Sequence, residues 1–483
     1  MARKEMIRNV AGMVLLAATL LFNATAYSRV TLRTIWGDNI VIQQNSEILI
    51  SGTANRASKV VVTASWNPGK RVVVYADKDG SFQAKLLTPK GSQQYYQVCF
   101  DDGETLCLNN ILVGDVWFCS GQSNMEMPVK GFRGQPVTGS LDAIVTAKAT
   151  RSIRLFTVKN AWSTTPAFNS VEGKWSAAGP EAVADFSAAA YFFANKLNQV
   201  VDIPIGIINC SWSMSKIEAW MSREMLAGFP AIAMPDPEQK EFGWTAGTPT
   251  LLFNAMVQPW QGFPVRGMLW YQGEANTGNP QLYKKLFPEM LKGYRAFFHQ
   301  QQMPFYFVQL APWKSDHKDS LDWAQFRQVQ LELSQELTHV GMVHTVDLGD
   351  EVFIHPPRKK EVGERLALWA LADAYGVKGF TPTGPVFQSA SVKDGAVEVT
   401  FKYGEFGLNP ENAPVEGFEI AGSDGHFLPA QAVVINATAV VKVWNEAVSM
   451  PVQVRYCFRN YKTGNLVNNF ALPAAPFSYT LTK

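Results

Sequence analysis

A serine that follows a short apolar run is the first residue whose setting suits covalent chemistry. The run Val116–Cys119 predicts a buried strand, which the polar turn at 120–122 ends. Ser123 follows, at the start of a possible helix. On a tight turn between a buried strand and a helix, a serine hydroxyl projects from the sheet beside backbone N–H groups that stabilise negative charge. An acyl-transfer nucleophile needs this setting, although an ordinary N-cap serine has the same local pattern.

A serine nucleophile also needs a base, which is usually a histidine oriented by a carboxylate. The chain has six histidines. His355 lies in a loop between the last apolar strand candidate and a predicted helix, and Asp350 and Glu351 precede it in that loop. Among the six, only His355 combines this location with nearby carboxylates. It is therefore the candidate base, and a surface loop histidine is the alternative interpretation.

The elements that would position these residues lie between 111 and 380. Six apolar runs predict strands there: Val116–Cys119, Arg154–Val158, Ile205–Cys210, Gly267–Tyr271, Phe305–Leu310 and Gly341–Val346. Residues 186–200, 323–337 and 360–375 favour helices. This alternation is typical of a parallel sheet covered by helices, whose active sites lie at the carboxyl ends of the strands. The polar clusters fall at those ends: Ser123, Ser211–Ser215, Gln272–Asn276 and His355.

Both flanking regions predict β-structure. Residues 27–110 and 381–483 consist of short alternating runs between Gly, Asn, Asp and Pro turns, which is typical of β-sandwich domains. Cys99 and Cys107 flank a hairpin signal at Asp102-Gly103, and a three-residue loop would place them opposite each other. In an oxidising compartment they could then form a disulfide. Cys119 and Cys210 are expected to be small core residues.

The N-terminal residues predict export. Basic residues at 3, 4 and 8, an apolar run over 10–22 and Ala24-Thr25-Ala26 are typical of a cleaved signal peptide spanning 1–26. An uncleaved signal anchor is the alternative. No later stretch is long and apolar enough for a membrane span. We therefore expect a periplasmic or secreted protein whose mature chain begins at Tyr27.

The composition excludes several classes of protein. Hydrophobic residues make up 47% of the chain and charged residues 17%, which is typical of a folded globular protein. The net charge is +2, and the basic residues form no stripe that would favour nucleic acid. The five cysteines match no zinc pattern, so we expect neither a metal ion nor an organic cofactor.

Three blocks of the sequence closely resemble the sialate O-acetylesterases, secreted carbohydrate esterases of the SGNH hydrolase superfamily. They are Trp117–Pro128, Trp270–Asn276, and Ile354–Pro356 with Val362–Ala367. The resemblance covers nearly all of the mature chain. It implies an SGNH-type three-layer α/β/α catalytic domain over 111–380, flanked by the two β-sandwich domains.

The resemblance also implies roles for individual residues. Ser123 would be the nucleophile, and His355 would be the base and then the acid for the departing sugar oxygen. The oxyanion hole would use the backbone N–H of Ser123, a backbone N–H of Ser213 or Met214, and the side-chain amide of Gln272. Each such donor contributes a factor on the order of 10²–10³ in rate. Further residues are expected to contact the substrate or support the site: Asn124, Glu274 and Asn276.

The chain departs from the family pattern in three places. Relatives usually carry Trp-Gly-Gly-Thr where this chain has Trp212-Ser213-Met214-Ser215, so the geometry of that oxyanion donor is in question. No aspartate lies two or three residues before His355. Either Asp350 or Glu351 orients the imidazole, or the site is a Ser–His dyad with a backbone carbonyl as the partner. A short stretch at 229–249 replaces a longer insertion, which would open the cleft.

The predicted reaction is hydrolysis of an O-acetyl ester on a sugar through an acetyl-serine intermediate. O-acetylated sialic acid is the substrate that the resemblance implies, and acetylated xylan or xyloglucan is the main alternative within the same chemistry. A glycosidase is disfavoured because Glu274 has no second carboxylate to form a pair. A carbohydrate-binding protein that has lost turnover is the alternative from another class.

Overall fold

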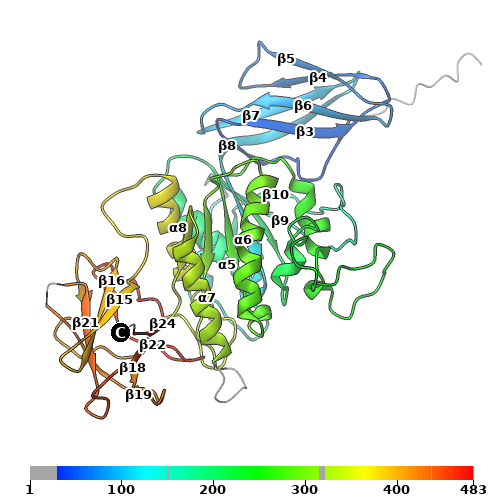
Figure 1. The fold of residues 1–483 in the computed structure, drawn as a ribbon. Helices are drawn as coiled ribbons and strands as arrows, with labels where there is room; N and C mark the ends of the chain where they lie inside the picture. Colours follow the sequence, from blue (N-terminus) through cyan, green and yellow to red (C-terminus); the bar gives the residue numbers. More distant parts are fainter. Residues whose placement is uncertain (1–29, 150–151, 315–320, 437, 482–483) are drawn as a thin grey trace, which may run out of the picture.

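The computed structural model describes residues 30–149, 152–314, 321–436 and 438–481, and the predicted signal peptide lies outside these ranges. Figure 1 shows three parts, with a β-rich N-terminal part at one end of a central α/β part and a second β-rich part at another side. The fold is therefore mixed α/β, with a large mixed sheet and additional antiparallel sheets.

The N-terminal part consists of two antiparallel layers. One sheet has the order β1-β3-β6, and the other pairs β5 with β4 and β4 with β7. Alternate residues of these strands are buried, which is typical of two sheets that share a core. The bounds are β1 (Thr31–Leu32), β3 (Glu47–Thr53), β4 (Lys59–Ala64), β5 (Arg71–Tyr75), β6 (Ser81–Leu87) and β7 (Ser92–Asp101).

The predicted hairpin and its disulfide are confirmed. Strand β7 turns into β8 (Thr105–Gly121) through a three-residue loop, and the ladder places Cys99 opposite Cys107. Their sulfur atoms are bonded, with 4.1 Å between the Cα atoms. Cys119 and Cys210 are free and buried, as expected for core residues.

Strand β8 joins the N-terminal part to the central part without a break. Its 17 residues begin in the disulfide hairpin and end in the middle of the central sheet. Short strand β2 (Val41–Gln43) pairs with it in parallel over Leu112–Gly114. The predicted domain boundary at residue 110 therefore lies inside a strand and not in a linker.

The central sheet has the order β10-β9-β11-β8-β12-β13-β14. Neighbouring strands from β9 to β14 run parallel, and edge strand β10 (Trp175–Ala177) runs antiparallel to β9. Each of the six predicted strands is present, although several bounds differ by a few residues. The bounds are β9 (Ile153–Thr157), β11 (Ile205–Ser211), β12 (Gly267–Tyr271), β13 (Phe305–Val308) and β14 (Val340–Val343).

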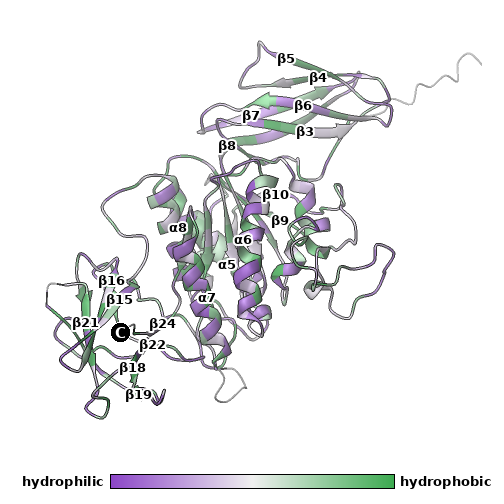
Figure 2. Cartoon of the chain, viewed as in Figure 1, coloured by the Kyte–Doolittle hydropathy of each residue, from purple (hydrophilic) through white to green (hydrophobic). Residues whose placement is uncertain are grey.

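Helices cover both faces of this sheet (Figure 1). Trp117 packs in one core cluster with α5 (Ala188–Asn198) and α8 (Lys359–Trp369). Phe118, on the opposite face of β8, packs in the other with α6 (Pro280–Phe297) and α7 (Asp322–Glu336). Figure 2 shows hydrophilic and hydrophobic residues interleaved along α6 and α7, as one-sided burial requires. Helix α6 is not among the helices that the sequence predicted.

Shorter elements complete the central part. The α-helical ones are α2 (Ser123–Glu126), α3 (Ser140–Val145) and α4 (Pro180–Ala184). Others are single turns: η1 (Ile217–Trp220), η2 (Thr245–Gly247), η3 (Phe253–Val257), η4 (Gln258–Trp260), η5 (Glu274–Asn276) and η6 (Ala370–Ala374). No helix in the described ranges has both the length and the apolar character that a bilayer span requires.

The C-terminal part contains two four-stranded antiparallel sheets, with orders β15-β16-β21-β20 and β19-β18-β22-β24. The ring of Phe477 lies 6.0 Å from that of Phe401 and 6.3 Å from that of Phe418, so both sheets contribute to one core. Buried Arg327 of α7 donates to the carbonyls of Arg459 and Asn460, which ties this part to the central one.

The strand bounds of this part are β15 (Val386–Lys393), β16 (Ala396–Lys402), β17 (Leu408–Asn409), β18 (Phe418–Ala421), β19 (Leu428–Pro429), β20 (Gln431–Val434), β21 (Val440–Trp444), β22 (Gln453–Tyr456), β23 (Val467–Asn468) and β24 (Phe477–Thr480). Strands β17 and β23 form a separate pair.

Candidate active site

Ser123 lies on a tight turn between β8 and α2, as the sequence predicts. Gly121 ends the strand with φ of +143°, and a Cβ atom there would lie 2.1 Å from the carbonyl oxygen of Tyr271. Only glycine therefore fits this approach of β8 to β12. Ser123 is the first residue of α2, so its N–H has no intrahelical acceptor and can serve an external one.

His355 lies in the loop between β14 and α8, against a loop that follows α2. Its Nδ1 is 2.7 Å from Oε1 of Gln135, and the edge of the Phe132 ring contacts the imidazole at a centroid distance of 5.3 Å. An amide oxygen can only accept, so Nδ1 carries the proton. Nε2 then keeps its lone pair and is the nitrogen that could accept a proton from a serine.

Asp350 and Glu351 are not brought to His355. Oδ1 of Asp350 accepts from the backbone N–H groups of Val352 and Phe353, which is an Asx-type turn. Glu351 pairs with Lys314 at 2.7 Å. Both acids are therefore occupied by other partners. The side-chain amide of Gln135, from a different loop, takes the place of the expected carboxylate at His355. The backbone carbonyl of the dyad alternative is not the partner either.

Asn124 joins the Ser123 segment to the His355 segment. Its Nδ2 donates to the carbonyl of Ile354 at 3.2 Å and to Oε1 of Glu274 at 2.5 Å. The residues adjacent to the two predicted catalytic side chains are thus in direct contact. Within the described ranges no hydrogen bond joins Ser123 Oγ to His355, so the structure places the two segments together without closing that bond.

Gln272 does not point a free donor toward the serine. Its Nε2 donates to the carbonyl of Ser215 at 2.9 Å and to Oδ1 of Asn276 at 2.8 Å, which uses both N–H bonds. Asn276 in turn accepts from the N–H of Ile217 and donates to Glu218. In this geometry Gln272 and Asn276 hold the loops after β11 and β12 together, and the expected oxyanion role of Gln272 is not supported.

The loop after β11 contains Ser213 and Met214, which stand where the sequence resemblance implies glycines. The backbone N–H and the hydroxyl of Ser213 both donate to Oε2 of Glu126, each at 2.5 Å. Met214 adopts φ of +60°, a left-handed conformation that costs a non-glycine residue about 1–2 kcal/mol. Its N–H has no acceptor among the described residues. Met214 therefore keeps a glycine-like backbone and a free donor, whereas the donor of Ser213 is occupied.

Burial sets the protonation state of the candidate base. Burial, and to a smaller extent the nearby positive charge of Lys359, together lower the pKa of His355 to about 4. The imidazole is therefore neutral at pH 7 and able to accept a proton. Burial also lowers the pKa of His344 to about 4, but that ring bonds through Nδ1 to the carbonyl of Pro473 in the C-terminal part. His344 is thus a core histidine.

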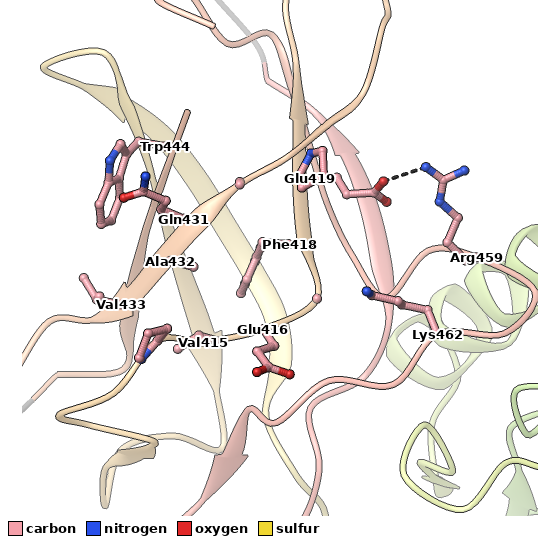
Figure 3. A pocket seen from close by; sticks show the side chains of 14 residues that line it. Val415, Glu416, Phe418, Glu419, Gln431, Ala432, Val433, Trp444, Arg459 and Lys462 are labelled. Atoms are coloured by element: carbon pink, nitrogen blue, oxygen red, sulfur yellow. Dashed lines mark hydrogen bonds and ion pairs between the residues drawn. The ribbon is translucent and has the colours of Figure 1, made fainter. Parts of the chain in front are cut away.

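A cavity of about 730 Å³ lies in the C-terminal part, away from these residues. Figure 3 shows Trp444 and Gln431 on one side of it and Glu416 and Lys462 on another, with Glu419 bonded to Arg459. None of the predicted site residues lines this cavity. In the part of the chain that the structure describes, no three His, Cys, Asp or Glu side chains are placed to hold a metal ion.

The fold and this site define an α/β protein with a buried serine and a neutral histidine on adjoining loops, and comparison with known proteins gives its family. Residues 113–372 match the family model described as carbohydrate esterase, sialic acid-specific acetylesterase. The chain therefore belongs to this family of esterases.

Individual relatives agree with that assignment. The mouse sialate O-acetylesterase is 30% identical over 438 residues, covering 77% of this chain and 78% of the relative. The human sialate O-acetylesterase is 28% identical over 414 residues, covering 78% and 77%. The crystal structure of a carbohydrate acetylesterase from Xanthomonas citri has a TM-score of 0.85 and 33% identity, covering 94% of this chain and all of that one.

Proposed function

We propose that this chain is an exported serine-type esterase of the SGNH type that hydrolyses O-acetyl esters on a sugar. The observation that carries the proposal is the junction at Asn124, which holds the His355 loop on the Ser123 helix while Gln135 occupies Nδ1. We assign Nε2 of His355, whose lone pair stays free, as the base that serves Ser123.

The mechanism follows from these positions. Ser123 Oγ attacks the acetyl carbonyl carbon, and its proton passes to Nε2 of His355. The tetrahedral intermediate collapses, the sugar oxygen leaves with that proton, and acetyl-Ser123 remains. Water then gives a proton to Nε2 and attacks the acetyl carbon, and collapse returns this proton to Ser123 Oγ as acetic acid leaves and ionises to acetate in solvent. We assign oxyanion stabilisation to the N–H groups of Ser123 and Met214.

O-acetylated sialic acid is the substrate that we propose, because the family model and the mammalian relatives carry that name. Acetylated xylan or xyloglucan uses the same chemistry and is the alternative. The predicted signal peptide supports the proposal that hydrolysis takes place in the periplasm or outside the cell.

Acetate release by the mature protein tests the function. O-acetylated sialic acid and acetylated xylo-oligosaccharides are offered in parallel, with Ser123→Ala as the control. We expect release that the variant lowers by about 10³-fold or more, since the nucleophile is lost. The preferred substrate decides between the two sugars.

A fluorophosphonate probe separates an esterase from a binding protein that has lost turnover. Labelling requires an activated serine, so we expect the wild-type protein to be labelled and Ser123→Ala to remain unlabelled. Sugar binding without either acetate release or labelling would contradict the proposed function.

A further inference from the structure

Lys359 occupies a position that is unfavourable for a lysine in two respects. It is fully buried, with no exposed surface. It is also the first residue of α8, where the positive end of the helix dipole disfavours a cation. Burial lowers the pKa of Lys359, and the carboxylate of Glu274 opposes that shift. A lysine at a position where burial and the helix dipole both disfavour its positive charge points to a role beyond packing.

Lys359 holds the His355 loop at the residue after His355, whereas Asn124 holds it at the residue before. Its Nζ donates to the carbonyl of Pro356 at 2.7 Å and to Oδ1 of Asn124 at 2.7 Å. Asn124 donates to the carbonyl of Ile354. The carbonyl groups before and after His355 are thus fixed by two side chains that also bond to each other.

Charged and titratable groups from three elements surround this contact. Glu274, which follows β12, bonds to Asn124 through Oε1, and burial raises its pKa while Lys359 lowers it. The ring of Tyr271 in β12 has its centroid 5.7 Å from Nζ of Lys359. His355 lies four residues before Lys359, in the loop that leads into α8. Neighbouring Arg358 pairs with Glu361 and so does not share the network.

We propose that Lys359 is a positioning residue of this site, which fixes the His355 loop to the Ser123 helix through Asn124 and places a positive charge near the imidazole. This inference rests on the proposed esterase function. Its two consequences are separable, because the hydrogen bonds set where Nε2 lies and the positive charge sets how readily His355 takes up a proton from solvent.

Two substitutions separate these consequences. Lys359→Met removes the donors and the charge at similar volume, whereas Lys359→Gln keeps an amide donor without the charge. Lys360→Met, at the exposed next position, is the matched control. Each protein is assayed for kcat and KM from pH 4 to 9, and the pKa of His355 is measured by NMR of labelled histidine, with His355→Gln identifying the signal.

We expect Lys359→Met to lower kcat by about 10²-fold with little change in KM, since a small misplacement of a catalytic group costs on this order. The pKa of His355 should rise in both Lys359 variants, because each lacks the positive charge. Lys359→Gln should recover part of kcat, and Lys360→Met should match the wild type.

Unchanged kcat and an unchanged His355 pKa in both Lys359 variants would overturn the inference. If Lys359→Met does not fold, judged by thermal unfolding, Lys359→Gln decides through its His355 pKa alone. Loss of kcat without any pKa change would likewise overturn it, since packing damage alone has that result. A wild-type protein that releases no acetate would contradict the proposed function, while the NMR titration would still test the charge.

Discussion

Two loops contact helix α2, which begins at Ser123, and they are held in opposite ways. The His355 loop is held by neutral or positive partners, namely the Gln135 amide, the Asn124 amide and the Lys359 ammonium group. The loop at Ser213 is held by a carboxylate, since Glu126 takes both its N–H and its hydroxyl.

The difference shows what each loop can contribute to catalysis. Neutral or positive partners on the His355 side leave Nε2 unprotonated and disfavour imidazolium. A carboxylate on the Ser213 side puts negative charge near the proposed oxyanion position, and it occupies the backbone donor of Ser213. We infer that the first loop supplies the proton chemistry and that oxyanion stabilisation depends on Ser123 and Met214.

Among the variants that test this comparison, removal of the candidate base His355 should lower kcat/KM the most. His355→Gln should lower kcat/KM by about 10²–10⁴-fold, because general base catalysis contributes a factor of this size. Acetate release measured at saturating and limiting substrate checks it, with His426→Gln in an exposed turn as the control. Activity near the wild-type level would mean that another group takes the proton from Ser123.

Substitutions of Gln135, the amide partner of His355, should have the next largest effect, and they should change how kcat/KM depends on pH. In the wild type, kcat/KM should fall only as the pH drops through about 4, because His355 then becomes protonated and cannot accept a proton. Gln135→Glu places a carboxylate on Nδ1, which raises the pKa and should move this fall to higher pH.

Gln135→Ala leaves the ring free to turn and should lower kcat by about 10-fold to 100-fold. A pH–rate profile of the three proteins measures both effects. An identical acid limb in the wild type and Gln135→Glu would show that the two side chains do not interact during turnover.

Glu126→Gln tests the Ser213 side with a smaller effect. The amide oxygen can still accept from Ser213, but the negative charge beside the developing oxyanion is removed. We expect kcat to rise several-fold, because electrostatic stabilisation of the transition state improves. A fall in kcat with an unchanged melting temperature would instead assign Glu126 a direct role in catalysis.

Substitutions of Asp350 and Glu351, the acids that the sequence predicted to orient His355, should change kcat the least. Asp350→Asn keeps an oxygen that can accept from the backbone N–H groups of the turn, and Glu351→Gln breaks an exposed ion pair. Each should change kcat by less than about twofold, as substitutions remote from buried contacts usually do. Steady-state kinetics of the two single variants suffice, and a large loss in either would restore a carboxylate partner.

The sequence predicted the parts of the site that local pattern determines. Ser123 follows from the strand–turn–helix pattern, His355 from its loop, and the Cys99–Cys107 disulfide from hairpin register. Gln135 could not be found in this way, because it lies 220 positions from His355 and only the tertiary fold joins them. Lys359 left one local signal, a cation at the start of a predicted helix.

The largest missed element was within reach of the sequence. Helix α6 has buried residues at helical spacing on one face and charged residues on the other, which is a clear helix pattern, and only Pro288 within it argues against a helix. The predicted boundary at residue 110 has another cause. Alternating runs before it and a fully buried run after it indicate different environments, and β8 passes through both as one strand.

Strand β8 makes the Ser123 turn inseparable from the N-terminal part during folding and in protein engineering. The covalently closed hairpin at one end and the Ser123 turn at the other lie on one continuous strand. A fragment starting at residue 111 would lose residues 105–110 of this strand and present an unpaired edge over Leu112–Gly114, where β2 binds in the intact chain. Chimaeras between relatives should therefore exchange residues 30–121 as one block.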